Sequence, residues 1–251
     1  MSLLPRQALA LTALALLLLA SCARPFGRQY EYEEEIYIDL DGSARVVVNT
    51  SLAALAALHG LDVPLDPAVP IDRDAIRALY ASPVTEVTRV SRPWRRDGRR
   101  FVQVRLDVSD VRRLPETRPF AWARYTFARQ GEAVQYVQEL GASVNKAVGD
   151  VGWDGSELVA VRMHVPSRVT FHNAPSRLVE RGNILSWEQP LKARLAGEPL
   201  RIEARFGVQR ILVMTVALFL AAMAAAAVTL TGLIWWVVRK GHQRAAASAR
   251  G

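Results

Sequence analysis

The stretch YEYEEEIYIDLDGSARVVVN, residues 30–49, decides the expected fold class. Its apolar and acidic side chains alternate with a period of two, which is typical of a β-strand with one buried face. The expected buried face carries Tyr30, Tyr32, Ile36, Ile38 and Leu40, and the expected outer face carries Glu31, Glu33, Glu35 and Asp39. Asp41-Gly42 is a strong signal for a tight turn, so residues 45–49 are expected to return as an antiparallel partner strand.

The same patterns continue along the chain and predict further hairpins and short helices. A helix is expected at 52–59, capped by Ser51 or Thr50 and ended by Gly60. A second helix is expected after a cap at Asp72, ending before Pro83. Strands are expected at 84–90, 100–108, 121–129, 133–140, 157–165, 169–172, 184–187 and 200–206. Residues 30–210 are therefore predicted to form one α+β domain, mainly antiparallel β-sheet with two or three helices.

The C-terminal part contains an uncharged run of 28 residues at 211–238. About 20 apolar residues suffice to cross a bilayer, so this run predicts a transmembrane helix. Trp235 and Trp236 at its end are expected at the membrane interface, beside Arg239 and Lys240. The tail 239–251 is basic and has no acid, which places it in the cytoplasm by the positive-inside rule and the preceding domain outside. The expected location is the cytoplasmic (inner) membrane.

The N-terminus predicts a signal peptide over residues 1–21, with Arg6 before a short apolar run at 8–20. The sequence Leu19-Ala20-Ser21-Cys22 resembles the lipobox of bacterial lipoproteins. This resemblance implies diacylglyceryl and acyl groups on Cys22 and a lipidated tether at 22–29. Cys22 is the only cysteine, so disulfides and thiol chemistry in the domain are excluded. No other cofactor is expected.

Three stretches of the final third have a recognisable order. These are VRMHVPSRVTFHNA at 161–174, RGNILSWEQPL at 181–191 and PLRIEARF at 199–206. With a lipobox in front and a membrane helix behind, this order resembles the LppM-like domain of bacterial envelope lipoproteins. The resemblance implies a membrane-tethered α/β lipoprotein domain, for some members of which an interaction with lipid headgroups has been suggested, and it implies no catalytic residues. The segment 52–83 has no counterpart in that pattern.

The clearest candidate site is SRPWRRDGRR, residues 91–100. It combines a tryptophan with five arginines at an expected hairpin tip: Arg92, Trp94, Arg95, Arg96, Arg99 and Arg100. Guanidinium groups bind phosphate oxygens in pairs of hydrogen bonds, so this tip is predicted to contact anionic lipid headgroups or an anionic envelope polymer. The alternative is a solvated turn without a ligand. The acidic run at 31–35 is expected to be a solvated strand face or a partner for the arginine tip.

The sequence does not favour a metal site, a catalytic site or a nucleic-acid-binding site. The histidines His59, His164 and His172 have no evident third ligand, so no metal site is expected, and no catalytic motif is present. The net charge is +8, but 27 of the 32 basic and all 24 acidic residues fall in 23–210, which leaves this segment near +3. Nucleic-acid binding is therefore not expected.

The sequence favours a membrane-anchored envelope lipoprotein that binds lipid headgroups or another envelope component without catalysis. The alternative is a scaffold or assembly protein for membrane-protein partners. For that function the alanines spaced four apart at Ala217, Ala221 and Ala225 would allow close helix contact, including a helix-mediated homodimer.

Overall fold

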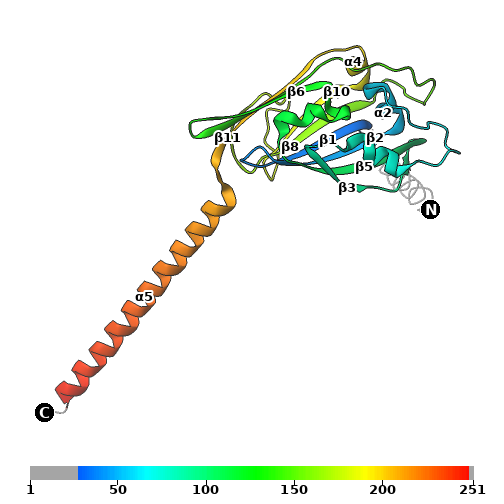
Figure 1. The fold of residues 1–251 in the computed structure, drawn as a ribbon. Helices are drawn as coiled ribbons and strands as arrows, with labels where there is room; N and C mark the ends of the chain where they lie inside the picture. Colours follow the sequence, from blue (N-terminus) through cyan, green and yellow to red (C-terminus); the bar gives the residue numbers. More distant parts are fainter. Residues whose placement is uncertain (1–27, 249–251) are drawn as a thin grey trace, which may run out of the picture.

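The computed structural model describes residues 28–248 and shows two β-sheets facing each other, with a long helix leaving one end (Figure 1). The larger sheet has the strand order β10-β8-β1-β2-β5-β3, with β4 paired to β5. The smaller sheet has the order β6-β7-β11-β9. The fold is therefore α+β with mostly antiparallel strands, as the alternating pattern predicts.

The larger sheet consists of β1 Tyr30–Ile38, β2 Ala44–Ser51, β3 Thr85–Val90, β4 Trp94–Arg96, β5 Arg99–Val108, β8 Leu158–His164 and β10 Ile184–Pro190. The smaller sheet consists of β6 Ala123–Gln130, β7 Ala133–Leu140, β9 Ser167–His172 and β11 Leu200–Arg210. The helices are α2 Leu52–His59, α3 Arg73–Tyr80, α4 Leu191–Leu195 and α5 Ile211–Ser248, with 3₁₀ helices η1 Val111–Glu116 and η2 Arg118–Phe120.

The opening hairpin forms as its sequence predicts. The register between β1 and β2 runs from Tyr32 opposite Thr50 to Ile38 opposite Ala44. Gly42 in the turn has φ = 89°, a backbone conformation that residues with a Cβ atom rarely adopt. On its other side β1 pairs in parallel with β8, because the chain crosses to the smaller sheet and back between them.

The two predicted caps are confirmed. The Ser51 hydroxyl accepts a hydrogen bond from the backbone N–H of Ala54 at 3.0 Å, and Gly60 ends α2 with φ = 68°. All eight residues of α2 are buried, so this apolar helix belongs to the core. The Asp72 carboxylate likewise accepts from the backbone at the start of α3.

Several elements differ from the sequence-based expectation. Strand β4, helix α4 and both 3₁₀ helices were not predicted, because segments of three to six residues carry too little periodicity. Residues 141–157 form a long irregular connection over α2. Its backbone N–H groups at Val144 and Lys146 donate to the carbonyls of Leu58 and Ala57 near the end of α2. Tertiary contact thus supplies partners for carbonyls that a short helix leaves unpaired.

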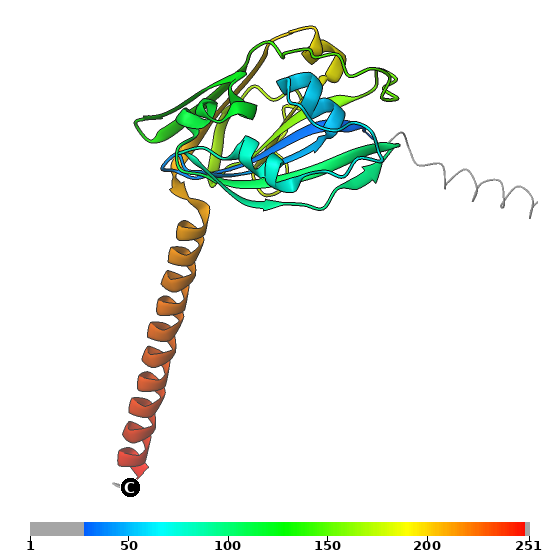
Figure 2. The ribbon, with the colours of Figure 1, turned by 45° about the vertical axis from the view of Figure 1, so that its right-hand side comes forward.

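Helix α5 follows β11 directly, without an intervening residue. Its segment Thr215–Trp236 is long and apolar enough to cross a membrane, and none of it is buried against the domain. Figure 2 shows α5 leaving the domain at the end of the sheets opposite the start of β1. Cys22, the signal peptide and most of the tether lie outside the described residues.

Candidate functional site: a basic tip beside an apolar pocket

The arginine-rich segment folds into the hairpin β4–β5 around Asp97-Gly98. Both turn residues have positive φ, 50° and 76°, which matches the tight turn that best joins two twisted strands. Arg92, Trp94, Arg95 and Arg96 are exposed on this hairpin, and we call this set the basic tip.

Trp94 fixes the shape of the basic tip. Its ring stacks on Phe101 of β5 with centroids 5.8 Å apart, yet 38% of the residue stays exposed. Arg96 also lies over the Phe101 ring, with Cζ 4.3 Å from the centroid, and donates to the backbone carbonyl of Tyr30. Arg96 is therefore partly committed to the protein. Among the described contacts, Arg92 and Arg95 have no ion-pair partner.

The expectation that all five arginines share an exposed tip is wrong for Arg99. Its side chain is buried, and Nε donates to the Glu31 carboxylate at 2.8 Å. The two remaining nitrogens donate to the Gly152 carbonyl at 2.9 Å and to Gln29 Oε1 at 3.1 Å. Every nitrogen of this guanidinium thus has an internal partner, which makes Arg99 a structural residue.

Arg100 is also turned inward. It donates to the backbone carbonyls of Asp66 and Val69, each at 2.7 Å, and to that of Pro64. Burial, and then the nearby charge of Arg95, lower the pKa of its guanidinium. Arg100 therefore ties the connection between α2 and α3 to the hairpin, and both of its terminal nitrogens are used in these contacts.

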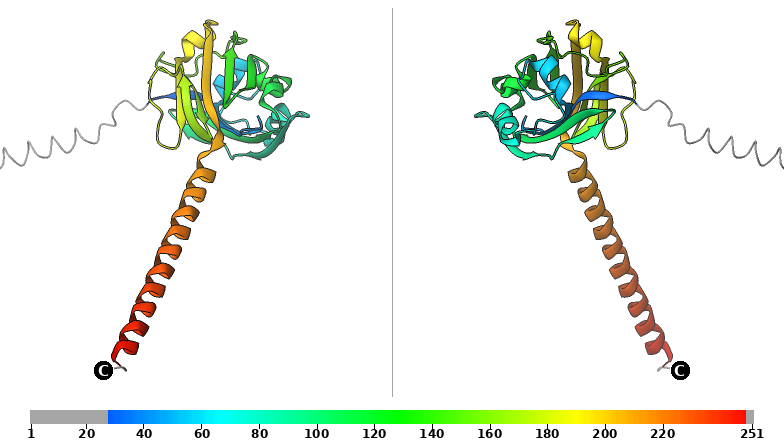
Figure 3. Two further views of the ribbon diagram at one scale, coloured as in Figure 1. Left: turned by 90° about the vertical axis from the view of Figure 1, so that its left-hand side faces the viewer. Right: turned by 90° about the vertical axis from the view of Figure 1, so that its right-hand side faces the viewer.

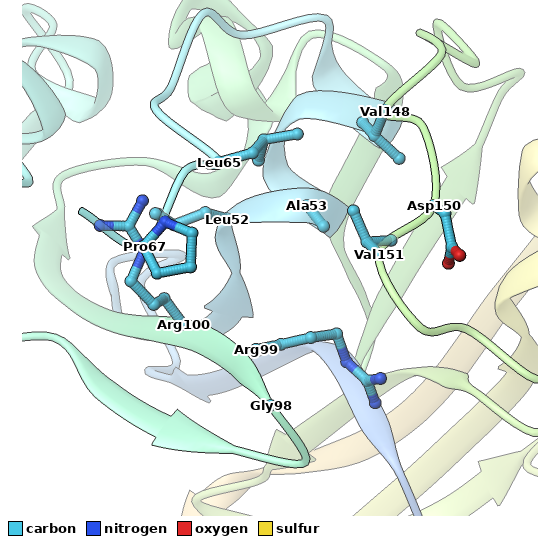
Figure 4. A pocket seen from close by; sticks show the side chains of 10 residues that line it. All are labelled: Leu52, Ala53, Leu65, Pro67, Gly98, Arg99, Arg100, Val148, Asp150 and Val151. Carbon is cyan, nitrogen blue, oxygen red and sulfur yellow. The ribbon is translucent and has the colours of Figure 1, made fainter. Parts of the chain in front are cut away.

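A pocket of about 410 Å³ opens beside the basic tip (Figure 4). Leu52 and Ala53 at the start of α2 meet Val148 and Val151 of the long irregular connection, and Leu65 closes a further side. Arg99 and Arg100 line the pocket toward the hairpin. A second hollow of about 360 Å³ lies between residues 67–71 and Trp94 with Arg95. Arg99 and Arg100 donate to internal partners, and Asp150 also lines the first pocket, so of these two hollows the one beside the exposed Arg95 better suits an amphiphilic anionic ligand.

No sequence pattern predicted this pocket. Its walls come from the starts of α2 and β5 and from two irregular connections far apart in the chain. The only signal was indirect: the proline-marked segment 64–70 is too long for a simple turn.

The acidic strand β1 is not uniformly solvated, which corrects a second expectation. Glu31 is buried as the partner of Arg99, in agreement with the other alternative for the acidic run. Glu34 is also buried, because it shares the inner face with Tyr32 and Ile36. Its carboxylate accepts from the Tyr32 hydroxyl and from Gln138 Nε2, each at 3.1 Å. Burial raises the pKa of Glu34 to about 7, although these hydrogen bonds oppose the rise.

The histidines are not gathered into a site. His59 is buried between the rings of Tyr32 and Trp122, and burial lowers its pKa to about 3. His164 stacks on Tyr37 with ring centroids 3.9 Å apart. Within residues 28–248, no group of three or more His, Cys, Asp or Glu side chains is placed to hold a metal ion.

The residues predicted at the membrane interface lie near the end of the apolar span. Trp235 and Trp236 are exposed on α5. The Arg239 guanidinium lies 5.0 Å from the Trp235 ring and Lys240 Nζ lies 4.4 Å from the Trp236 ring. Each basic residue thus pairs with the indole four residues earlier on the helix.

Comparison with known proteins gives one distant likeness. No protein-family model and no curated protein matches the chain. Among solved structures, the chain is similar to the NMR structure of the folded domain of LppM from Mycobacterium tuberculosis. The identity is 16% and the TM-score 0.40, over 73% of this chain and 94% of that domain.

Proposed function

We propose that this protein is a membrane-anchored envelope lipoprotein whose basic tip binds anionic headgroups or another anionic envelope component, without catalysis. The observation that carries the proposal is the pair Arg92 and Arg95, exposed and without carboxylate partners among the described contacts, beside the exposed Trp94. A basic residue near an anionic surface contributes about 1 kcal/mol, and an indole favours the interface.

The two anchors proposed for the chain bear on how the basic tip meets a bilayer. Strand β1 has nine residues, which at about 3.3 Å each separates its two ends by about 30 Å. The tip contacts Tyr30 at the start of β1, whereas α5 leaves the opposite end (Figure 2). A lipid on Cys22 would hold the tip end down, because residues 22–28 span at most about 20 Å. The proposed lipidation thus supports a domain that lies along the outer face of the cytoplasmic membrane, with the basic tail in the cytoplasm.

Vesicle flotation of residues 28–210 tests the proposal. This fragment keeps the whole core, because no part of the span packs on the domain. We expect the wild-type fragment to float with phosphatidylglycerol-containing vesicles and not with pure phosphatidylcholine. The Arg92→Ser/Arg95→Ser variant removes about 2 kcal/mol, which lowers the partition coefficient roughly 30-fold.

The matched control is Arg112→Ser/Arg113→Ser on η1, which makes the same change in net charge at two exposed arginines. Each of these is paired with a neighbouring carboxylate, Asp110 or Glu116. Equal flotation of the wild type and the tip variant, or an equal loss in the control, would exclude the basic tip as the binding surface.

The alternative function, assembly with membrane-protein partners, is favoured by one observation. The whole span Thr215–Trp236 is exposed, including the alanines four apart, so its surface is free for protein neighbours in a bilayer. Crosslinking of the full chain in mild detergent tests this. A stoichiometric partner, or a dimer lost on Ala221→Leu, would support it, and a monomer without partners would oppose it.

A further inference from the structure

The connection between β9 and β10, residues 173–183, lies at the end of the domain from which α5 emerges. Figure 3 shows this connection descending beside the start of α5. We call residues 175–182, all of them exposed, the lower loop. It is separate from the basic tip, which lies at the other end of β1.

Backbone pairing fixes the C-terminal base of the lower loop, at Asn183, close to the start of α5, whereas Asn173 at the other end of the connection donates its backbone N–H to the Glu203 carbonyl, seven residues before Arg210. Arg210, the last residue of β11, is in register with Ser167 at the start of β9. The Ser167 carbonyl accepts from Asn183 Nδ2 at 3.1 Å, and the backbone N–H of Val165 donates to the Asn183 carbonyl at 3.1 Å. Neighbouring strands lie about 4.8 Å apart, so the base of the loop lies within about 10 Å of the end of β11.

Because no spacer separates β11 from α5, the base of the lower loop lies near any bilayer that α5 crosses. Helix α5 begins at Ile211, and its membrane-competent segment begins at Thr215. Four residues of helix rise only about 6 Å. The headgroup layer is itself about 5–7 Å thick on each side. A span seated in a bilayer therefore brings the base of the lower loop to the headgroups.

The lower loop has the composition of an interfacial contact. Leu178 is 68% exposed and Val179 is 42% exposed. They stand between Arg177 and Arg181, with Glu180 as the one acid of the segment. Two adjacent exposed aliphatic residues flanked by cations match a surface that inserts its apolar part and pairs its charges with phosphates.

The loop is also held in shape. The backbone N–H of Arg177 donates to the Ala174 carbonyl at 3.0 Å, and Arg177 has φ = 51°. Glu180 and Ile184 exchange backbone hydrogen bonds of 2.9 and 3.3 Å, which close the loop. The exposed aliphatic pair is thus presented by an ordered turn, and little ordering entropy remains to be lost on contact.

From these observations we infer that the lower loop docks into the headgroup layer of the bilayer that α5 crosses, with Leu178 inserted and Arg177 and Arg181 on lipid phosphates. This contact restrains rotation of the domain about α5. The contact of the lower loop requires that α5 crosses the bilayer, but it does not require that the basic tip binds an anionic ligand.

Spin-label accessibility in the full chain tests the inference. In a Cys22→Ser background, Leu178→Cys carries the label, and Val144→Cys serves as the control because it is 63% exposed in an irregular loop. The proteins are placed in nanodiscs of phosphatidylcholine with phosphatidylglycerol. We expect the label at 178 to be shielded at least fivefold from a water-soluble nickel relaxant, relative to the label at 144, and to gain access to oxygen.

Two further variants separate this inference from the proposed function. Arg177→Ser/Arg181→Ser should return the label at 178 toward water, whereas Arg92→Ser/Arg95→Ser should leave it shielded. Equal nickel accessibility at 178 and 144 would overturn the inference, whatever the basic tip binds. Shielding at 178 that disappears with the tip variant would also overturn it, because the loop would then be held only by the tip.

Discussion

Replacing Glu34 by glutamine is expected to change how the stability of the domain depends on pH. Glu34 sits between the two sheets beside the hydroxyl of Tyr32 and the amide of Gln138, and among the described residues no cation forms an ion pair with it. Burial raises its pKa from 4.5 to about 7, so the folded state binds this proton more tightly than the unfolded state does. The contribution of Glu34 to stability is therefore largest below pH 4.5 and falls as the pH rises to 7.

The size of the effect follows from the displacement of the pKa. The pKa of Glu34 rises from 4.5 to about 7, and each pKa unit corresponds to about 1.4 kcal/mol. Above pH 7 the ionised carboxylate therefore lowers the free energy of unfolding by about 3 kcal/mol. His59 acts in the opposite direction, since burial lowers its pKa from 6.5 to about 3. Its contribution is present above pH 6.5 and is lost as the pH falls toward 3. Between pH 4.5 and 6.5 the pH-dependent contributions of Glu34 and His59 to the stability of the wild type largely cancel. Glu34→Gln removes the contribution of Glu34 and leaves that of His59.

Urea unfolding of residues 28–210, followed by tryptophan fluorescence at pH 4.5 and pH 8, measures the effect. We expect the free energy of unfolding of Glu34→Gln minus that of wild type to be about 3 kcal/mol larger, in the stabilising direction, at pH 8 than at pH 4.5. The control is Glu86→Gln, at an exposed position of β3. A relative stability of Glu34→Gln that is the same at both pH values, within about 1 kcal/mol, would refute the buried-carboxylate argument.

Three further substitutions test single contacts by urea unfolding of the same fragment. Arg99→Met leaves the Glu31 carboxylate buried without its cation and should lower the free energy of unfolding by about 3–5 kcal/mol. The double variant Arg99→Met/Glu31→Leu should restore most of this loss. If it restores none, the broken ion pair is not the cause of the lost stability. Ser51→Ala removes the cap of α2 and should cost about 1 kcal/mol, with Ser51→Asn retaining more stability than alanine. Gly42→Ala forces φ = 89° on a residue with a Cβ that would lie 3.1 Å from the Phe127 ring, and should cost about 1–2 kcal/mol or more. A neutral outcome would contradict the observed turn.

Most of the secondary structure could be predicted because its signals are local. Alternation along residues 30–38 and the Asp41-Gly42 turn determine the first hairpin. Ser51 and Gly60 mark both ends of α2, since a cap needs only a side-chain oxygen or a missing Cβ at one position. The apolar run before Trp235 predicts α5 from length alone.

The candidate site could be predicted only in part. The run of arginines is visible in the sequence, but its division into exposed and buried members is not. Arg99 turns inward because Glu31 lies 68 positions earlier in the chain on a strand that the sheet brings to the same end, and Arg100 turns inward toward carbonyls of residues 64–69. Such pairings depend on strand order, which no local pattern encodes.

The sequence by itself determined the class of fold, the hairpins, the caps and the apolar span, because each depends on residues within a few positions of one another. Only the tertiary structure decided which charges are free. It buried Glu34 where the second sheet covers the first, and it left Arg92 and Arg95 in solvent. It also brought the lower loop beside the start of α5. The physical reason is that burial and ion pairing are set by surfaces that meet across the fold, between residues far apart in the chain.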